Sequence, residues 1–169
     1  MNKQESIEIK SFNFKDDGHI PNNPNYSLLL YENVLNSKND IKEIFSQNDW
    51  YGAWNGTVAT HHHYHSNTHE VLAVVSGWAN LQLGGEKGVE AKVKKGDVIV
   101  LPAGTGHKLI EKSTEFAVVG AYPNGNKYDF CYGKEDERPK KIENIQNVPV
   151  PDTDPLFGRS GPLFSFWKR

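Results

Sequence analysis

Short apolar runs separated by glycine and proline dominate the chain from about residue 50 to residue 122. The runs cover residues 71–75, 78–83, 89–93, 98–101, 107–111 and 116–121. Runs of this length, rich in β-branched or aliphatic residues and bounded by turn residues, are typical of β-strands. Many short strands joined by Gly/Pro turns favour a β-sandwich or barrel over an alternating β/α fold.

The alternation of apolar and polar residues within these runs indicates which strands have one face exposed to solvent. Residues 78–83 place apolar and more polar side chains on opposite faces, as a strand on the wall of a barrel does. One face holds Ala79, Leu81 and Leu83, and the other holds Trp78, Asn80 and Gln82. Residues 71–75 are apolar on both faces, so their periodicity does not indicate which face lines the interior.

The flanking segments add short elements around this core. Residues 11–31 are interpreted as strand, turn, loop and strand, and residues 39–45 as a short helix with a polar cap. A second short helix is expected over 139–146. The tail, residues 149–169, is rich in proline and aromatic residues and is expected to pack on the body. We therefore expect one domain, 1–169, with a barrel core at about 50–122.

Composition excludes several classes of protein. The 169 residues carry a net charge of −2 with both signs interspersed, so there is no basic surface for a nucleic-acid backbone. The single cysteine, Cys131, excludes an internal disulfide and a Cys-rich zinc site. No apolar leader or membrane-length run is present in the sequence. A soluble cytoplasmic protein is expected.

The histidines point to a metal site. Of seven, five lie between residues 61 and 69, and another is His107. His63 and His65 are two residues apart, so in an extended segment they project to the same side. Glu70 opens the next strand, and His107 opens another after a Pro-x-Gly turn. Three imidazoles and a carboxylate suit Fe, Mn, Ni, Co, Cu or Zn and suit Ca or Mg poorly.

These residues stand in two motifs that resemble those of the cupin superfamily. The first reads His63-x-His65-(x)4-Glu70-(x)6-Gly77, and the second reads Gly96-(x)5-Pro102-x-Gly104-(x)2-His107. The resemblance implies an all-β, double-stranded β-helix (a jelly-roll-type barrel) with one divalent transition metal in its mouth. It also implies His63, His65, Glu70 and His107 as the ligands, and a homodimer.

A smaller group is similar along nearly the whole chain, namely the small bacterial single-domain cupins of the YjlB type. The similar segments are residues 14–22, 63–70, 101–107, 120–123 and 154–158. This resemblance implies a fold and a metal site, but it does not imply a particular reaction.

Three positions near the motifs stay open. A spacing of three residues after His65 would select His69 as the ligand in place of Glu70, although the spacing to Gly77 favours Glu70. His61 shares parity with His63 and either extends inward or lies at an edge. Glu111 shares parity with His107, which makes it a candidate general base or partner of a ligand, with a solvated strand-end charge as the alternative.

Three classes of function are compatible with such a site. The first is a metal-dependent enzyme that oxidises a small organic molecule in a dioxygenase-like reaction, or isomerises it. The second is a non-catalytic module that binds or senses a small molecule. The third, a structural or storage role, is disfavoured by the short chain and the filled set of ligand positions. Neither a nucleic acid nor a membrane is expected as a partner.

Overall fold

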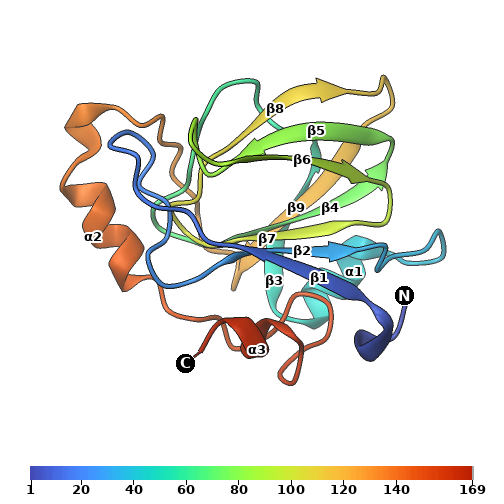
Figure 1. The fold of residues 1–169 in the computed structure, drawn as a ribbon. Helices are drawn as coiled ribbons and strands as arrows, with labels where there is room; N and C mark the ends of the chain where they lie inside the picture. The colour runs from blue at the N-terminus through green and yellow to red at the C-terminus, as the bar shows by residue number, and fades with distance from the viewer. Residues whose placement is uncertain (169) are drawn as a thin grey trace.

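The computed structural model describes residues 1–168, which form two stacked antiparallel sheets (Figure 1). The larger sheet has the strand order β1-β2-β7-β4-β9-β3, and the smaller has the order β6-β5-β8. The strands are β1 (Glu8–Phe12), β2 (Leu28–Glu32), β3 (Trp50–Gly56), β4 (Glu70–Ser76), β5 (Trp78–Leu83), β6 (Val89–Lys94), β7 (Val98–Leu101), β8 (His107–Lys112) and β9 (Ala117–Pro123). The predicted all-β jelly-roll architecture is confirmed.

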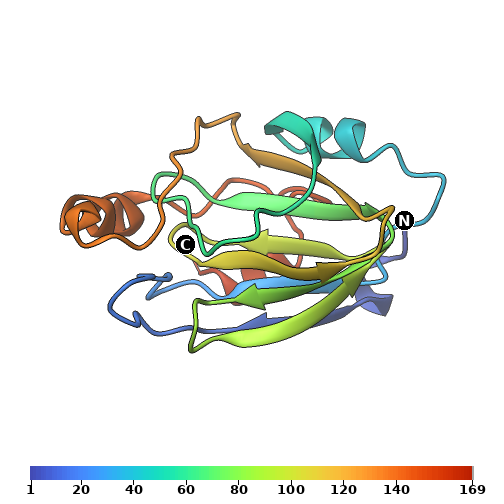
Figure 2. The same ribbon diagram turned by 90° about the horizontal axis from the view of Figure 1, so that it is seen from above.

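The helical elements are short and peripheral, as expected. They are η1 (Gln4–Ser6), α1 (Ile41–Gln47), η2 (Glu135–Glu137), α2 (Lys140–Asn147) and α3 (Leu163–Phe166). Asp40 caps α1 by accepting a hydrogen bond from the backbone amide of Glu43. The view from above shows α2 at one end of the sandwich and α1 along its side (Figure 2). The sequence did not indicate α3, which is a single turn.

The strand boundaries agree with the apolar runs to within two residues. The clearest case is β5, where Ala79, Leu81 and Leu83 are buried and the alternate side chains are half-buried. One segment differs: Phe14 lies in a loop, because the first strand ends at Phe12. Its ring instead stacks on that of Phe12.

The larger sheet is buried on both faces, which accounts for its continuous apolar runs. Between the sheets, Leu72 and Val74 of β4 pack with Leu81 of β5. On the outer face, Val71 and Ala73 pack with residues of α1 and of the C-terminal segment. Side chains of even number on β4 therefore face the barrel interior, and those of odd number face outward.

The two ends of the chain are attached to this larger sheet. β1 and β2 pair with each other, and β2 pairs with β7. Trp167 is fully buried on the outer face, where its indole N–H donates to the carbonyl of Ser27 at 2.8 Å. The buried Asp154 carboxylate accepts from the phenol of Tyr31 at 2.6 Å and from the backbone amide of Leu163 at 3.0 Å.

No helix among residues 1–168 is both long and apolar enough to cross a lipid bilayer.

Candidate metal centre

His63 and His107 are brought together by backbone pairing. The two residues exchange hydrogen bonds across an isolated antiparallel bridge, with N–O distances of 3.3 and 3.0 Å. Their ring centroids lie 4.0 Å apart. His107 is the first residue of β8, at the end of the sandwich where α2 lies (Figure 1). The bridge thus joins a loop segment to the start of a strand.

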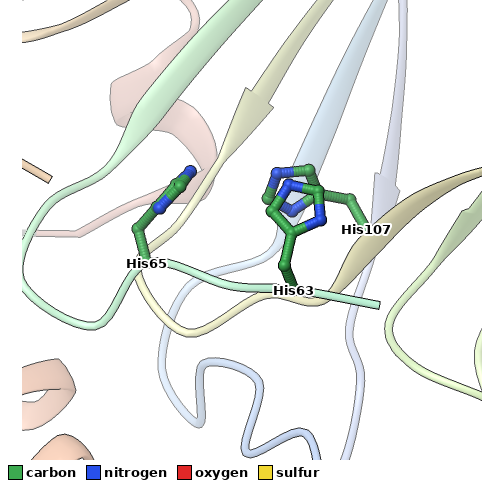
Figure 3. Close-up of side chains that lie close together, drawn as sticks. All are labelled: His63, His65 and His107. Carbon is green, nitrogen blue, oxygen red and sulfur yellow. The ribbon is translucent and has the colours of Figure 1, made fainter. Parts of the chain in front are cut away.

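The next residues of that loop alternate in direction. Tyr64 exchanges two backbone hydrogen bonds with Cys131, both 2.9 Å, and its side chain packs away from the histidines with Ile20 and Ile145. His65 then points back to the side of His63. Imidazole nitrogens of His63, His65 and His107 all lie within 4.8 Å of one another (Figure 3). All three residues are buried.

Glu70 completes this cluster from β4. Its even position places it on the interior face, as the burial of Leu72 and Val74 between the sheets requires. Its Oε1 lies 3.3 Å from Nε2 of His65 and 3.6 Å from Nε2 of His107. The carboxylate therefore lies beside two of the three imidazoles.

Backbone carbonyls fix the tautomer of each imidazole. Nδ1 of His63 lies 3.0 Å from the carbonyl of His61, Nδ1 of His65 lies 2.5 Å from that of Asp129, and Nδ1 of His107 lies 3.0 Å from that of Thr105. A carbonyl only accepts, so each Nδ1 carries a proton and donates it. In the neutral ring each Nε2 then has a free lone pair, which is how a histidine that binds a metal is usually oriented.

Burial controls the charge of the cluster. It lowers the pKa of His63 to about 4 and, with the nearby His63 and His65, lowers the pKa of His107. Burial alone would also lower the pKa of His65, but the Glu70 carboxylate and the Asp129 carbonyl outweigh it and raise that pKa. A proton held between His65 and Glu70 would have to leave when a cation bound between them.

The turn before β8 explains the second motif. Gly104 has φ of +90°, and a Cβ there would lie 2.7 Å from the carbonyl oxygen of Asn22 and 2.6 Å from Ile145. Its amide donates to the carbonyl of His65 at 2.7 Å. A residue with a side chain would be strained in this turn, which connects His65 to the strand that carries His107.

A cavity of about 160 Å³ opens onto the cluster. Its walls are mostly apolar and aromatic. The lining residues are Trp54, Thr57, Val58, Ala59, His63, His65, Glu70, Leu72, His107, Tyr122, Tyr128 and Phe130. A metal held by the four side chains would therefore face a small open chamber, as in catalytic sites, rather than being closed off by protein.

Tyr122 connects the carboxylate to the cavity wall. The indole N–H of Trp54 donates to the Tyr122 phenol oxygen at 2.9 Å. Burial and the neighbouring Glu70 carboxylate raise the pKa of Tyr122. The phenol therefore stays protonated and is positioned to donate to Glu70.

Residues 124–132, which we call the strap, close one side of the cavity. The Asp129 carboxylate accepts hydrogen bonds from the amide and hydroxyl of Ser66. It also forms an ion pair with Lys141 at 3.0 Å. Its neighbours Tyr128 and Phe130 point the other way and line the cavity. The sequence held no signal for Asp129, because its partner Ser66 is remote in the chain.

The structure places the other histidines outside the cluster. His69 immediately precedes β4 and lies on the outer side of the larger sheet, against Trp167. His61 is exposed and stacks on Tyr132 with 5.2 Å between ring centroids. His62 points to Glu86, with 2.7 Å between Nε2 and the carboxylate.

Glu111 is not brought to the cluster. Leu109 pairs with Leu81 and Glu111 pairs with Asn80, so Ile110 is an extra residue that forms a β-bulge. Because of the bulge, the side chain of Glu111 no longer points to the same side of β8 as that of His107, although the two positions are four residues apart. The Glu111 side chain is exposed and accepts a hydrogen bond from Asn80 at 3.4 Å.

Solved structures with similarity to this chain have low sequence identity. Acireductone dioxygenase from Bacillus anthracis is 16% identical, with a TM-score of 0.42, over 76% of this chain and 84% of that one. An uncharacterised protein with a double-stranded β-helix domain from Klebsiella pneumoniae is 14% identical, with a TM-score of 0.39, over 79% and 85%.

Sequence comparison is more informative. The model of the cupin domain family matches residues 53–120. Uncharacterized protein YjlB of Bacillus subtilis is 42% identical over 160 residues, which covers 95% of this chain and 97% of the relative. Together with the two sheets and the buried histidines, this identity shows that the chain belongs to the YjlB-type cupins.

Proposed function

We propose that this protein is a metal-dependent enzyme acting on a small organic molecule, with His63, His65, Glu70 and His107 holding one divalent transition metal. The observation that carries the proposal is the preset tautomer of the three imidazoles. Each Nδ1 is engaged by a backbone carbonyl, and the imidazole nitrogens lie within 4.8 Å of one another.

The donor set fits such an ion. Neutral imidazole and carboxylate ligands suit Fe, Mn, Ni, Co or Zn. The bound metal would supply Lewis acidity or the activation of dioxygen, which supports oxidation of the substrate or its isomerisation. The protein's own groups would bind and orient the substrate in the cavity, exclude water with Trp54, Leu72 and Phe130, and hold the Glu70 carboxylate through Tyr122.

Elemental analysis of untagged protein, purified without a nickel column, tests the metal site. We expect about one ion per chain in the wild type and loss of most of it in His63→Ala and His107→Ala. His62→Ala is the matched control, because this adjacent histidine is bound to Glu86 and should leave the metal content unchanged. Full metal content in both ligand variants would refute the assignment.

A second measurement separates an open site from a closed one. Azide or cyanide should perturb the spectrum of the cobalt-loaded protein, because the ion faces the cavity. Substrate-dependent oxygen uptake or product formation then distinguishes an enzyme from a module that only binds a ligand. The homodimer implied by the family stays a prediction, which light scattering in solution checks.

A further inference from the structure

We infer that the ligand of this cavity is a planar monoanion about the size of one aromatic ring, and that Tyr128 and Phe130 select it. The inference rests on the proposed function, since it takes a divalent metal as the point of attachment. Size, charge and wall chemistry of the cavity each support it separately.

The size of the cavity limits the ligand. A dry protein cavity of about 150 Å³ is sufficient to bind benzene, and this cavity measures about 160 Å³. One ring fits within that volume, and a fused ring system or a sugar nucleotide would project beyond it. Larger substituents would have to extend past the half-exposed Tyr128 and Phe130.

The charges around the cavity limit the ligand further. Glu70 is the one carboxylate among the described lining residues, and these include no lysine or arginine. Two cations near this end of the fold are paired, Lys141 with Asp129 and Lys108 with Glu86. A divalent ion beside Glu70 leaves one net positive charge, which a monoanion neutralises. A second negative charge would have no partner in an apolar wall.

The walls favour a flat ligand. The Phe130 ring stacks on His63, with 4.5 Å between centroids and 7° between planes. Tyr128 stacks on Tyr122 at 4.9 Å and meets His65 edge-on at 5.0 Å. Both rings lie directly beside imidazoles of the cluster, and both remain about half exposed (49% for Tyr128, 40% for Phe130). Exposed rings at the mouth of a cavity offer faces and edges on which another ring can pack.

The strap presents these rings in a fixed arrangement. Tyr128 and Phe130 flank Asp129, whose carboxylate is bound to Ser66 and whose carbonyl accepts from His65. Asn67 anchors the same segment, since its side chain donates to the Lys127 carbonyl at 2.9 Å. A wall that is already ordered loses little conformational entropy when a ligand binds. Tyr128 and Phe130 are therefore specificity-determining residues.

Calorimetric titration of metal-loaded protein with three probes tests the inference. Salicylate is a planar monoanion that carries a carboxylate and a neighbouring hydroxyl group. The cis isomer of 2-hydroxycyclohexanecarboxylate has the same donors and charge but is not planar, and 5-sulfosalicylate is planar with an added negative charge. We expect salicylate to bind at least about tenfold more tightly than either of the others.

Variants identify the residues responsible. Tyr128→Ala and Phe130→Ala should each weaken salicylate binding about tenfold and leave azide binding unchanged, because azide contacts the metal alone. Tyr51→Ala is the matched control, since this exposed tyrosine does not line the cavity. It should bind both probes as the wild type does.

The possible failures are distinguishable. Equal affinity for salicylate and its saturated analogue, or salicylate binding unaffected by both strap variants, overturns the ligand class while the metal site stands. Preference for 5-sulfosalicylate overturns the charge argument. Protein that takes up no metal overturns the proposed function and this inference with it.

Discussion

Nδ1 of His69 accepts a hydrogen bond from the backbone amide of Ala103 at 2.9 Å. Nε2 of the same ring then carries the proton and donates to the carbonyl of Pro149, also at 2.9 Å. The ring lies among the aromatic side chains of Tyr26 and Trp167. Both nitrogens are therefore occupied by backbone, and His69 ties the turn before β8 to the C-terminal segment.

This arrangement makes stability dependent on pH. Burial lowers the pKa of His69 to about 4, whereas the unfolded chain binds the proton near pH 6.5. Between these values the unfolded state takes up more protons, so stability falls as pH falls from 6.5 to 4. The contribution of His69 to this loss is about 3 kcal/mol, and it is fully expressed below pH 4.

His69→Gln isolates that contribution from those of the other buried histidines. The variant should be less stable than the wild type at pH 7, and the difference should narrow at pH 4.5. Urea denaturation of the metal-free proteins at both values measures it. An equal difference at the two pH values would show that protonation of His69 does not destabilise the fold.

The competition between His69 and Glu70 shows what periodicity can and cannot predict. Both faces of β4 are apolar because the larger sheet is covered on both sides, so periodicity does not indicate which face lines the cavity. Tertiary packing decides it. Residues of even number face the smaller sheet, and residues of odd number face Trp167, which is almost a hundred residues away in the chain.

The strands and the histidine cluster were predictable because their signals are local. The alternation of apolar and polar residues predicted β5, and the glycines in the turns predicted the boundaries of β4 and β7. The position of Glu111 was not predictable, since the extra residue Ile110 reverses parity within one strand. Asp129 and Trp54 were not predictable either, because each acts through a partner more than sixty residues distant.

Asp129→Ala should loosen the strap and, with it, the carbonyl that orients His65. We expect a decrease in metal affinity of about tenfold, as is typical when the partner of a ligating histidine is removed. Competition with a chromogenic chelator measures it. Lys141→Ala is the control and should have a smaller effect, because Ser66 still holds the carboxylate. Unchanged affinity in Asp129→Ala would show that the carbonyl is held without the side chain.

Glu111→Gln tests whether Glu111 acts as a general base or as a partner of a metal ligand, the role predicted from its position four residues after His107. The side chain is exposed and bonded to Asn80, so we expect metal content and salicylate affinity to match those of the wild type. Elemental analysis and calorimetry provide both values. A loss of either would restore Glu111 as a functional residue and imply a rearrangement of β8 around the bulge.

Tyr122→Phe removes one hydroxyl group from the wall of the cavity. Glu70 then loses the donor that holds its carboxylate, and the indole N–H of Trp54 loses its acceptor. We expect metal affinity to fall about tenfold, with the fold retained because the ring still fills its place. Trp54→Phe separates the two effects, since it leaves the Tyr122 phenol beside Glu70 and should lower metal affinity less. Equal losses in the two variants, measured by chelator competition, would show that Trp54 positions the phenol and that the three residues act as one unit.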